Sequence, residues 1–240
     1  LQHSRYRPFA LIMWELSLYH STTWRNFWRT ELALGYRPRG YYDYYEPRVD
    51  DRYFHEPPSW AGGIEIASDE RKKLAGEFET AVFYYPENQR QEYIVSFRPR
   101  YRISDRLTTS VSTTSDLYWN DYGWVETLSG GTPDPLIVFG RREVVNIDNV
   151  MEVRYVFTTD ISMNLRARHY WSRVDYSHFY SLQDNGELLP LDYEENNDID
   201  FNAFNVDLQF LWFFAPGSQM SLVWKNNILS VGEVPSDNYF

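Results

Sequence analysis

The chain has 240 residues, with 23 Lys and Arg against 34 Asp and Glu, which gives a formal net charge of −11. This acidic balance argues against nucleic acid as a partner, because such binding needs a basic surface that displaces counterions from phosphate. The sequence has no Cys, which excludes disulfide bridges and thiolate metal sites. A mean hydropathy of −0.56 and the lack of a long apolar run exclude a transmembrane helix, but a membrane β-strand needs only about 9–11 residues with alternate positions polar.

Aromatic residues are unusually frequent, with 20 Tyr, 15 Phe and 9 Trp making up 18% of the chain. So many rings are hard to bury in a soluble domain that also carries this much charge. Two classes of β protein use rings heavily, namely carbohydrate-binding proteins and outer-membrane barrels with aromatic girdles. The order of elements along the chain has to distinguish them.

Alternation of apolar and polar residues recurs along the whole chain, which is typical of β-strands, whereas helical spacing is rare. The clearest segment is 204–212, where Phe204, Val206 and Leu208 alternate with Asn205 and Asp207. In chain order the pattern predicts ten strands, at 9–20, 24–37, 60–68, 73–85, 90–104, 106–120, 137–159, 161–180, 199–214 and 218–229.

The predicted connections alternate between two kinds. Tight turns are expected at 20–23, 69–72, 104–106, 159–161 and 215–219. The other connections are mostly long and polar, at 38–59, 122–136 and 181–198, with 86–89 as a short member. Tight turns at one end and long loops at the other are typical of outer-membrane barrels, whose turns are periplasmic and whose loops are extracellular.

Strand length favours the membrane class further, because 137–159 and 161–180 far exceed the roughly 5–6 residues usual in globular strands. The sequence therefore predicts an all-β, antiparallel, up-and-down transmembrane β-barrel. A soluble β-sandwich or barrel remains the alternative, although large rings on nearly every strand would overfill a closed core. If the tight turns are periplasmic, the first and last predicted strands both end outside the cell, whereas bacterial barrels start and end in the periplasm. Residues 1–240 are thus expected to be a single domain that forms part of a larger barrel, incomplete at both ends.

Two hairpins resemble a known family. Residues 201–210 (Phe-Asn-Ala-Phe-Asn-Val-Asp-Leu-Gln-Phe), 214–218 (Phe-Ala-Pro-Gly-Ser) and 222–226 (Leu-Val-Trp-Lys-Asn) look like its penultimate hairpin, and residues 98–107 are similar to another. The family consists of uncharacterised bacterial outer-membrane β-barrel proteins, common in Bacteroidota, with an N-terminal region similar to a family 9 carbohydrate-binding module. The resemblance implies that this chain is the C-terminal part of the barrel, without the last strand and the sugar-binding-like region, and it implies no catalytic residues.

Within the same hairpin, Pro216 and Gly217 predict a type II turn, because Pro presets φ at the first corner and Gly accepts a positive φ at the second.

Charged side chains of both signs fall on the polar side of the predicted strands, which would face a barrel lumen. Two interpretations remain open for this set, namely an ion-pair network that fills a narrow lumen and a water-filled channel whose field selects anionic or sugar substrates. The predicted lumen-lining residues are Arg98, Arg100, Arg102, Arg154, Arg166, Arg168, Glu77, Glu79, Glu152 and Asp207.

The outer loops carry many rings and acids. Rings beside carboxylates stack on sugars, but they also occur in aromatic girdles and protein-contact surfaces. The candidate extracellular contacts are Tyr41, Tyr42, Tyr44, Tyr45, Tyr53 and Trp60. Acids cluster at two places in these loops, at Asp50, Asp51 and Glu56 and at Glu194, Glu195, Asp198 and Asp200. The second cluster begins like a calcium loop at Asp198 but lacks the Gly and the terminal Glu at the required offsets, so both clusters are expected to be solvated.

No metal, cofactor or enzymatic activity is predicted, since no nucleophile, base and partner can be assembled from the sequence and only His178 near Asp175 resembles part of a dyad. The expected function is an integral outer-membrane barrel of a Gram-negative bacterium, a porin-like channel or transporter for small polar or glycan-derived solutes. The alternative is a plugged structural or partner-binding barrel of a surface complex, and a weaker alternative is a soluble carbohydrate-binding β protein. The expected partners are outer-membrane lipid and, as further candidates, a glycan or another surface protein.

Overall fold

A computed structural model describes residues 2–5, 11–129 and 135–232 of the chain. These residues form one sheet of fourteen strands. The part of the chain described contains no helix that is long and apolar enough to cross a bilayer. The strands are β1 (Gln2–Arg5), β2 (Leu11–Thr23), β3 (Arg29–Arg37), β4 (Tyr41–Asp43), β5 (Phe54–Glu56), β6 (Ser59–Ala67), β7 (Leu74–Tyr85), β8 (Arg90–Arg102), β9 (Leu107–Leu128), β10 (Leu136–Val156), β11 (Ile161–Leu182), β12 (Leu188–Leu191), β13 (Ile199–Ala215) and β14 (Ser218–Gly232).

All ten predicted strands are present, and each long strand pairs antiparallel with the next in the order β2-β3-β6-β7-β8-β9-β10-β11-β13-β14. Some ends differ from the prediction. The first turn lies at 24–28 instead of 20–23, because Phe27 N donates to the Trp24 carbonyl at 2.9 Å and closes it. β9 continues to Leu128, through residues expected to lie in a loop. The four short strands β1, β4, β5 and β12 were not predicted, since three or four residues show no alternation.

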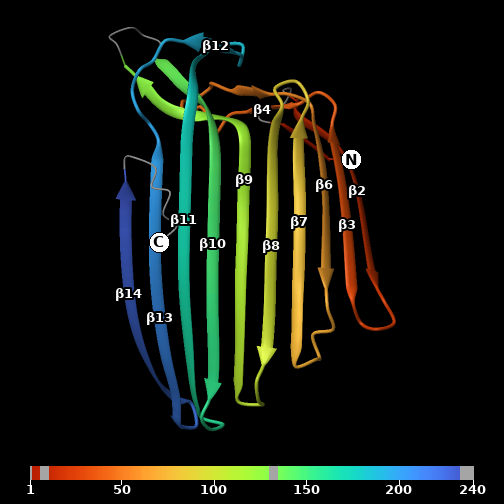
Figure 1. Ribbon diagram of the computed structural model, residues 1–240, viewed down its shortest axis with the longest axis vertical. Coiled ribbons are helices and arrows are strands. Elements are labelled where there is room, and N and C mark those ends of the chain that lie inside the picture. Colours follow the sequence, from red (N-terminus) through yellow and green to blue (C-terminus); the bar gives the residue numbers. More distant parts are fainter. Residues whose placement is uncertain (1, 6–10, 130–134, 233–240) are drawn as a thin grey trace.

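The two kinds of connection lie at opposite ends of the sheet, as predicted (Figure 1). Tight turns join the long strands at one end, and β4, β5 and β12 lie within the long connections at the other. The Pro216-Gly217 turn joins β13 to β14, and Gly217 has a φ of 73°, as a type II turn requires at that corner.

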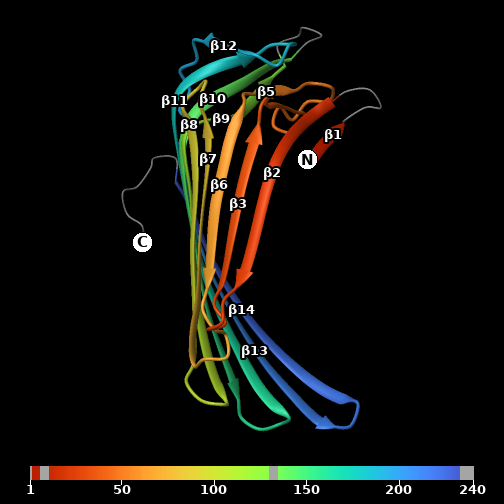
Figure 2. The ribbon, with the colours of Figure 1, turned by 90° about the vertical axis from the view of Figure 1, so that its right-hand side faces the viewer.

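The sheet is curved but not closed. Its order ends at β14 on one side, and on the other β2 pairs with β1 and, through Met13 and Tyr41, with β4. Figure 2 shows both edges turning toward the same side, where β5 also lies. The prediction of an all-β, antiparallel, up-and-down sheet is confirmed, whereas closure into a barrel is not shown.

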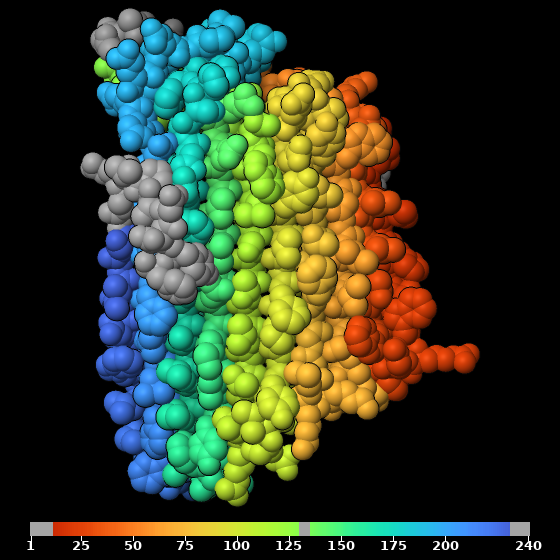
Figure 3. All heavy atoms as spheres, viewed as in Figure 1, coloured from red at the N-terminus to blue at the C-terminus, as the bar shows by residue number. Residues whose placement is uncertain are grey.

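The convex face is apolar and exposed. Because partners across an antiparallel ladder point to the same face, the register collects the apolar positions of every long strand on one side. Large side chains there are open to the outside, with exposed fractions of 65% at Leu18, 54% at Phe97 and 66% at Leu222. Figure 3 shows this face as a broad surface of side chains from β3 through β14.

The concave face is charged, and its long-loop end is covered by the chain itself. The 38–58 segment, which contains β4 and β5, folds back onto this face. A small hydrophobic core fixes it there, in which Phe54 packs with Ile137, Phe139 and Leu182, all at most 5% exposed. Arg52 Nη2 also donates to the Leu182 carbonyl at 2.9 Å. The segment thus creates a buried environment for charged groups near the end of the sheet.

Candidate functional site

The predicted lumen-lining residues do share one face. The register places Glu77 opposite Arg98, Glu152 opposite Arg166, and Arg166 opposite Asp207. These residues come from strands β7, β8, β10, β11 and β13, so a band of both charge signs crosses the concave face. Since closure is not shown, their place in a lumen stays a prediction.

Most of the band is held by ion pairs. Arg98 binds Glu77 and, at 3.0 Å, Glu79, while Arg166 lies 3.4 Å from Glu152. Arg168 makes a two-pronged contact with Asp148 at 2.8 and 2.9 Å. These groups are partly exposed, so each pair contributes only about 0–1 kcal/mol to stability. The band is therefore organised by electrostatics and remains accessible to water.

The other predicted charges in the band lie outside these pairs. Arg100 donates to the backbone carbonyl of Glu70. Asp207 lies 3.8 Å from Lys225, and both line a groove of about 610 Å³ with Arg154 and Arg166. Arg102 lies on the same face as Arg100, near the tight-turn end of β8.

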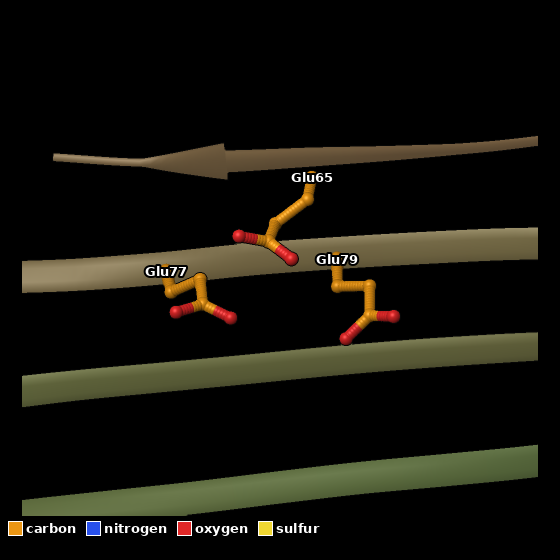
Figure 4. A group of neighbouring side chains, drawn as sticks. All are labelled: Glu65, Glu77 and Glu79. Carbon is orange, nitrogen blue, oxygen red and sulfur yellow. The ribbon is translucent and has the colours of Figure 1, made fainter. Parts of the chain in front are cut away.

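Three carboxylates meet on β6 and β7, which the sequence did not indicate. Figure 4 shows Glu65, Glu77 and Glu79 converging, with one oxygen of each within 4.8 Å of the others. Such a group could hold a metal ion, but Arg29 lies 2.6 Å from Glu65, and Arg98 binds the other two. Because guanidinium groups already balance these carboxylates, we assign them to the ion-pair band.

A second group of charges lies at the long-loop end, between the 38–58 segment and strands β8 to β11. It surrounds a cavity of about 380 Å³, which we call the Arg90 cavity. Its lining residues are Tyr41, Asp43, Glu46, Glu56, Arg90, Tyr118, Asp121, Tyr122, Arg142, Val144, Asn146, Ser172 and Val174.

Arg90 is the centre of this group. Its guanidinium lies 2.6 Å from Glu56 and 2.8 Å from Asp121, and Asp121 is also bound by Arg142 at 2.7 Å. Glu56 and Asp121 are buried, with exposed fractions of 4% and 2%. Charged pairs removed from water in this way depend strongly on one another, because loss of either partner leaves an uncompensated charge.

Burial also changes the acidity of the groups in the 38–58 segment. Desolvation raises the pKa of the Glu56 carboxyl, and the nearby Arg90 opposes this effect. Desolvation likewise raises the pKa of Glu46, although its Oε1 accepts a hydrogen bond from Trp124 N at 2.8 Å. The pKa of the Tyr41 hydroxyl is raised for the same reason. The carboxyl groups of Glu46 and Glu56 are therefore more easily protonated than carboxyl groups in water, and the Tyr41 hydroxyl is harder to ionise.

The sequence did not predict the Arg90 cavity. The expectation that the acid clusters are solvated is wrong for Glu56 and for Asp200, which are 4% and 6% exposed. Asp121 and Arg142 face the cavity where the register of β9 and β10 shifts between Arg142 and Val144, so strict alternation fails there. A sequence signal does exist, since Arg90, Asp121 and Arg142 all lie toward the long-loop ends of their strands. Only the inward fold of the 38–58 segment brings Glu56 to them.

The six predicted aromatic contacts do not form one surface. Tyr42 and Tyr44 each contact Tyr53, with ring centroids 5.2 and 5.3 Å apart. Tyr41 instead lines the Arg90 cavity, and Tyr45 is 89% exposed. Trp60 lies on the convex face, where it stacks on Tyr36 at 3.9 Å. An extracellular binding role for these rings stays a prediction.

Fold and site together define an antiparallel β-sheet protein with an exposed apolar face and an opposite face that carries ion pairs and a polar cavity. The chain belongs to a family described as a domain of unknown function, DUF5916, whose model matches residues 2–240. No curated protein matches the chain. The resemblance of the two hairpins implied an uncharacterised family, and the family match agrees with that implication.

Proposed function

We propose that this chain forms part of the wall of an outer-membrane β-barrel of channel or transport type, for small polar or glycan-derived solutes. The observation that carries the proposal is the separation of faces, apolar and exposed on the convex side and charged on the concave side. It extends over long strands that have 9 residues in β3 and β6, 12 in β7 and up to 22 in β9. At about 3.3 Å per residue and a tilt near 40°, 12 residues span roughly 30 Å, enough for an apolar band about 25 Å tall.

The convex face favours lipid as its environment. Monomeric soluble proteins rarely expose apolar patches larger than a few hundred Å², and larger patches mark membrane or protein contacts. Exposed rings and aliphatic side chains occur on this face near both ends of the strand order, for example Leu18 of β2 at 65% and Trp224 of β14 at 52%. A soluble carbohydrate-binding protein would need another layer to cover this face.

The free edge of β14 favours closure by further strands. β14 has 15 residues and pairs only with β13 in the described sheet. In lipid, backbone N–H and C=O groups must find partners within the protein, so an open edge of this length is unstable there. Strands from elsewhere in the full-length protein would pair with this edge and with the β1 and β2 edge.

A second candidate function is supported by the 38–58 segment. It covers the concave face at the long-loop end, and the pair of Glu56 with Arg90 holds it there at 2.6 Å. A barrel blocked by such a segment would act as a structural or partner-binding component, with its exposed loops contacting a surface protein or polysaccharide. The resemblance of the two hairpins adds two features to both candidate functions. The protein would come from a bacterium of the Bacteroidota type, and it would carry a region similar to a carbohydrate-binding module N-terminal to the barrel.

The experiment is membrane fractionation of the full-length native protein, followed by gel mobility before and after boiling and by conductance in planar bilayers. We expect an integral outer-membrane protein with a mobility shift on boiling and discrete conductance steps. A shift without steps would favour the plugged barrel. Recovery in the soluble fraction with no shift would contradict both membrane proposals.

A further inference from the structure

We propose that the Arg90 cavity binds a neutral mono- or disaccharide. This proposal deepens the proposed function, because it names a class of solute and a site that binds it. It rests on that function, since it requires that the concave face borders the path of the solute. Four features of the cavity support it, namely buried polar atoms without protein partners, its rings, its charge and its size.

Two buried polar atoms indicate a polar ligand. Glu56 Oε2 and Arg90 Nε are inaccessible, and neither has a hydrogen-bond partner among the described residues. Both residues line the cavity. A buried acceptor or donor left unpaired costs about 1–3 kcal/mol, and more when it is charged. Because both atoms lie below the accessible surface, a ligand must draw the two side chains toward the cavity to pair with them, and that pairing would recover the energy.

The chemistry of the two atoms favours a hydroxylated ligand. Glu56 Oε2 needs a donor and Arg90 Nε–H needs an acceptor, and a hydroxyl group is both. Three tyrosines, Tyr41, Tyr118 and Tyr122, also line the cavity and give it apolar ring surface. A sugar presents hydroxyl groups at its rim and C–H groups on its ring faces, so it matches this mixture.

The charge of the cavity selects a neutral ligand. Four carboxylates and two guanidinium groups line it, which gives a formal charge of −2. An anion such as a sugar phosphate would be repelled by this excess. A small cation would meet Arg90, which lies within 2.8 Å of both Glu56 and Asp121 and already neutralises them. A neutral polyol avoids both penalties.

The size of the cavity limits the ligand to one or two sugar units. Its volume of about 380 Å³ lies near the lower end of the range for small-molecule sites, roughly 300–1,000 Å³. A polysaccharide chain would not fit unless the 38–58 segment moved away.

The test is isothermal titration calorimetry on the full-length protein in detergent. The probes are glucose, galactose, maltose and cellobiose, with glucose 6-phosphate, inorganic phosphate and calcium as charged comparisons. We expect saturable binding of at least one neutral sugar, and weaker binding of glucose 6-phosphate than of glucose. Glu56→Gln should weaken the affinity for the sugar at least about tenfold, because it removes the buried carboxylate acceptor.

Glu87→Gln is the matched control, since Glu87 is exposed in the connection between β7 and β8 and does not line the Arg90 cavity. It should change the affinity less than about twofold, as expected for a group that does not touch the ligand. Gel mobility before and after boiling reports whether each variant folds. If Glu56→Gln does not fold, Tyr41→Leu replaces it, and loss of ring contact should weaken binding in the same direction.

The proposal is overturned if no neutral sugar binds at concentrations up to about 10 mM, which corresponds to a very weak site. It is also overturned if a charged probe binds more tightly than every sugar, or if neither Glu56→Gln nor Tyr41→Leu weakens binding. Because the titration needs no pore, a protein that binds sugar without conducting contradicts only the channel. A protein that conducts without binding sugar contradicts only this site.

Discussion

Arg90 links the 38–58 segment to the sheet, and its substitution is the most informative at the scale of single residues. Arg90→Met would leave Glu56 and Asp121 buried without the cation that lies 2.6 and 2.8 Å from them. We expect the free energy of unfolding to fall by about 3–5 kcal/mol, as measured by urea unfolding in detergent. Arg166→Met is the control, because its pair with Glu152 is half-exposed and should contribute less than about 1 kcal/mol. Equal losses in the two variants would contradict the central place of Arg90.

Asp69 gives a pH-dependent prediction. Its carboxylate accepts hydrogen bonds from Arg71 Nε at 2.8 Å and Nη2 at 2.9 Å, in the turn between β6 and β7, and these lower its pKa to about 2. A carboxyl whose pKa is lower in the folded state stabilises the fold above its unfolded pKa, here the ordinary 3.8, and that stabilisation is lost as the pH falls through about 2.

NMR titration of the Asp69 carboxyl carbon measures this directly. We expect a titration midpoint near pH 2 in the wild type. The midpoint should lie closer to 3.8 in Arg71→Gln, which lacks the guanidinium group. A wild-type midpoint at or above 3.8 would show that the contact with Arg71 does not persist in solution.

At the scale of single elements, the turn between β13 and β14 depends on the conformation of Gly217. Its φ of 73° is unfavourable for residues with a Cβ, and no atom lies within 4 Å of where that Cβ would be. Gly217→Ala should therefore lower the free energy of unfolding by about 1 kcal/mol through backbone strain alone. Gly217→Asn should cost less, because Asn tolerates this region. Urea unfolding that ranks the two variants in the reverse order would contradict the turn geometry.

Adjacent residues of β9 test the two faces of the sheet. Val111 is 41% exposed on the convex face, opposite Met151, and Ser110 lies on the concave face, opposite Glu152. In a bilayer, Val111→Arg should cost up to about 2–4 kcal/mol of folding free energy, because it places a charge in lipid. Ser110→Arg should cost little, since its new charge lies beside Glu152 in a polar environment. If both variants fold into lipid vesicles equally well, the convex face does not contact lipid.

The elements also show where the sequence was informative. Alternation predicted β8, β11 and β13 closely, because each long strand carries its own pattern of faces and needs no distant partner to reveal it. The Arg90 cavity was missed because it depends on contacts across long stretches of chain, such as Glu56 with Arg90, and on the bulge beside Arg142. The local alternation of apolar and polar residues predicts neither that a loop folds inward nor where a bulge lies.

For the molecule as a whole, curvature and the separation of faces have a common consequence. The edges of the curved sheet turn toward the same side (Figure 2). Its ion pairs and the Arg90 cavity lie on the concave face, and its exposed apolar side chains lie on the convex face. The free edges at β14 and at β1 and β2 then define where further strands would complete a barrel. The 38–58 segment would narrow the interior at the long-loop end, so we expect conductance to increase when this segment is deleted.

Lipid contact along β9 is the claim on which the rest depends, and the absence of native Cys allows it to be measured with single-cysteine variants of the full-length protein. Spin labels would be placed one at a time at residues 109 to 114, in lipid vesicles. Collision rates with oxygen, which concentrates in lipid, and with a water-soluble nickel complex would be compared by electron paramagnetic resonance. We predict high oxygen access at 109, 111 and 113 and high nickel access at 110, 112 and 114. High nickel access at every position would contradict a membrane-embedded sheet.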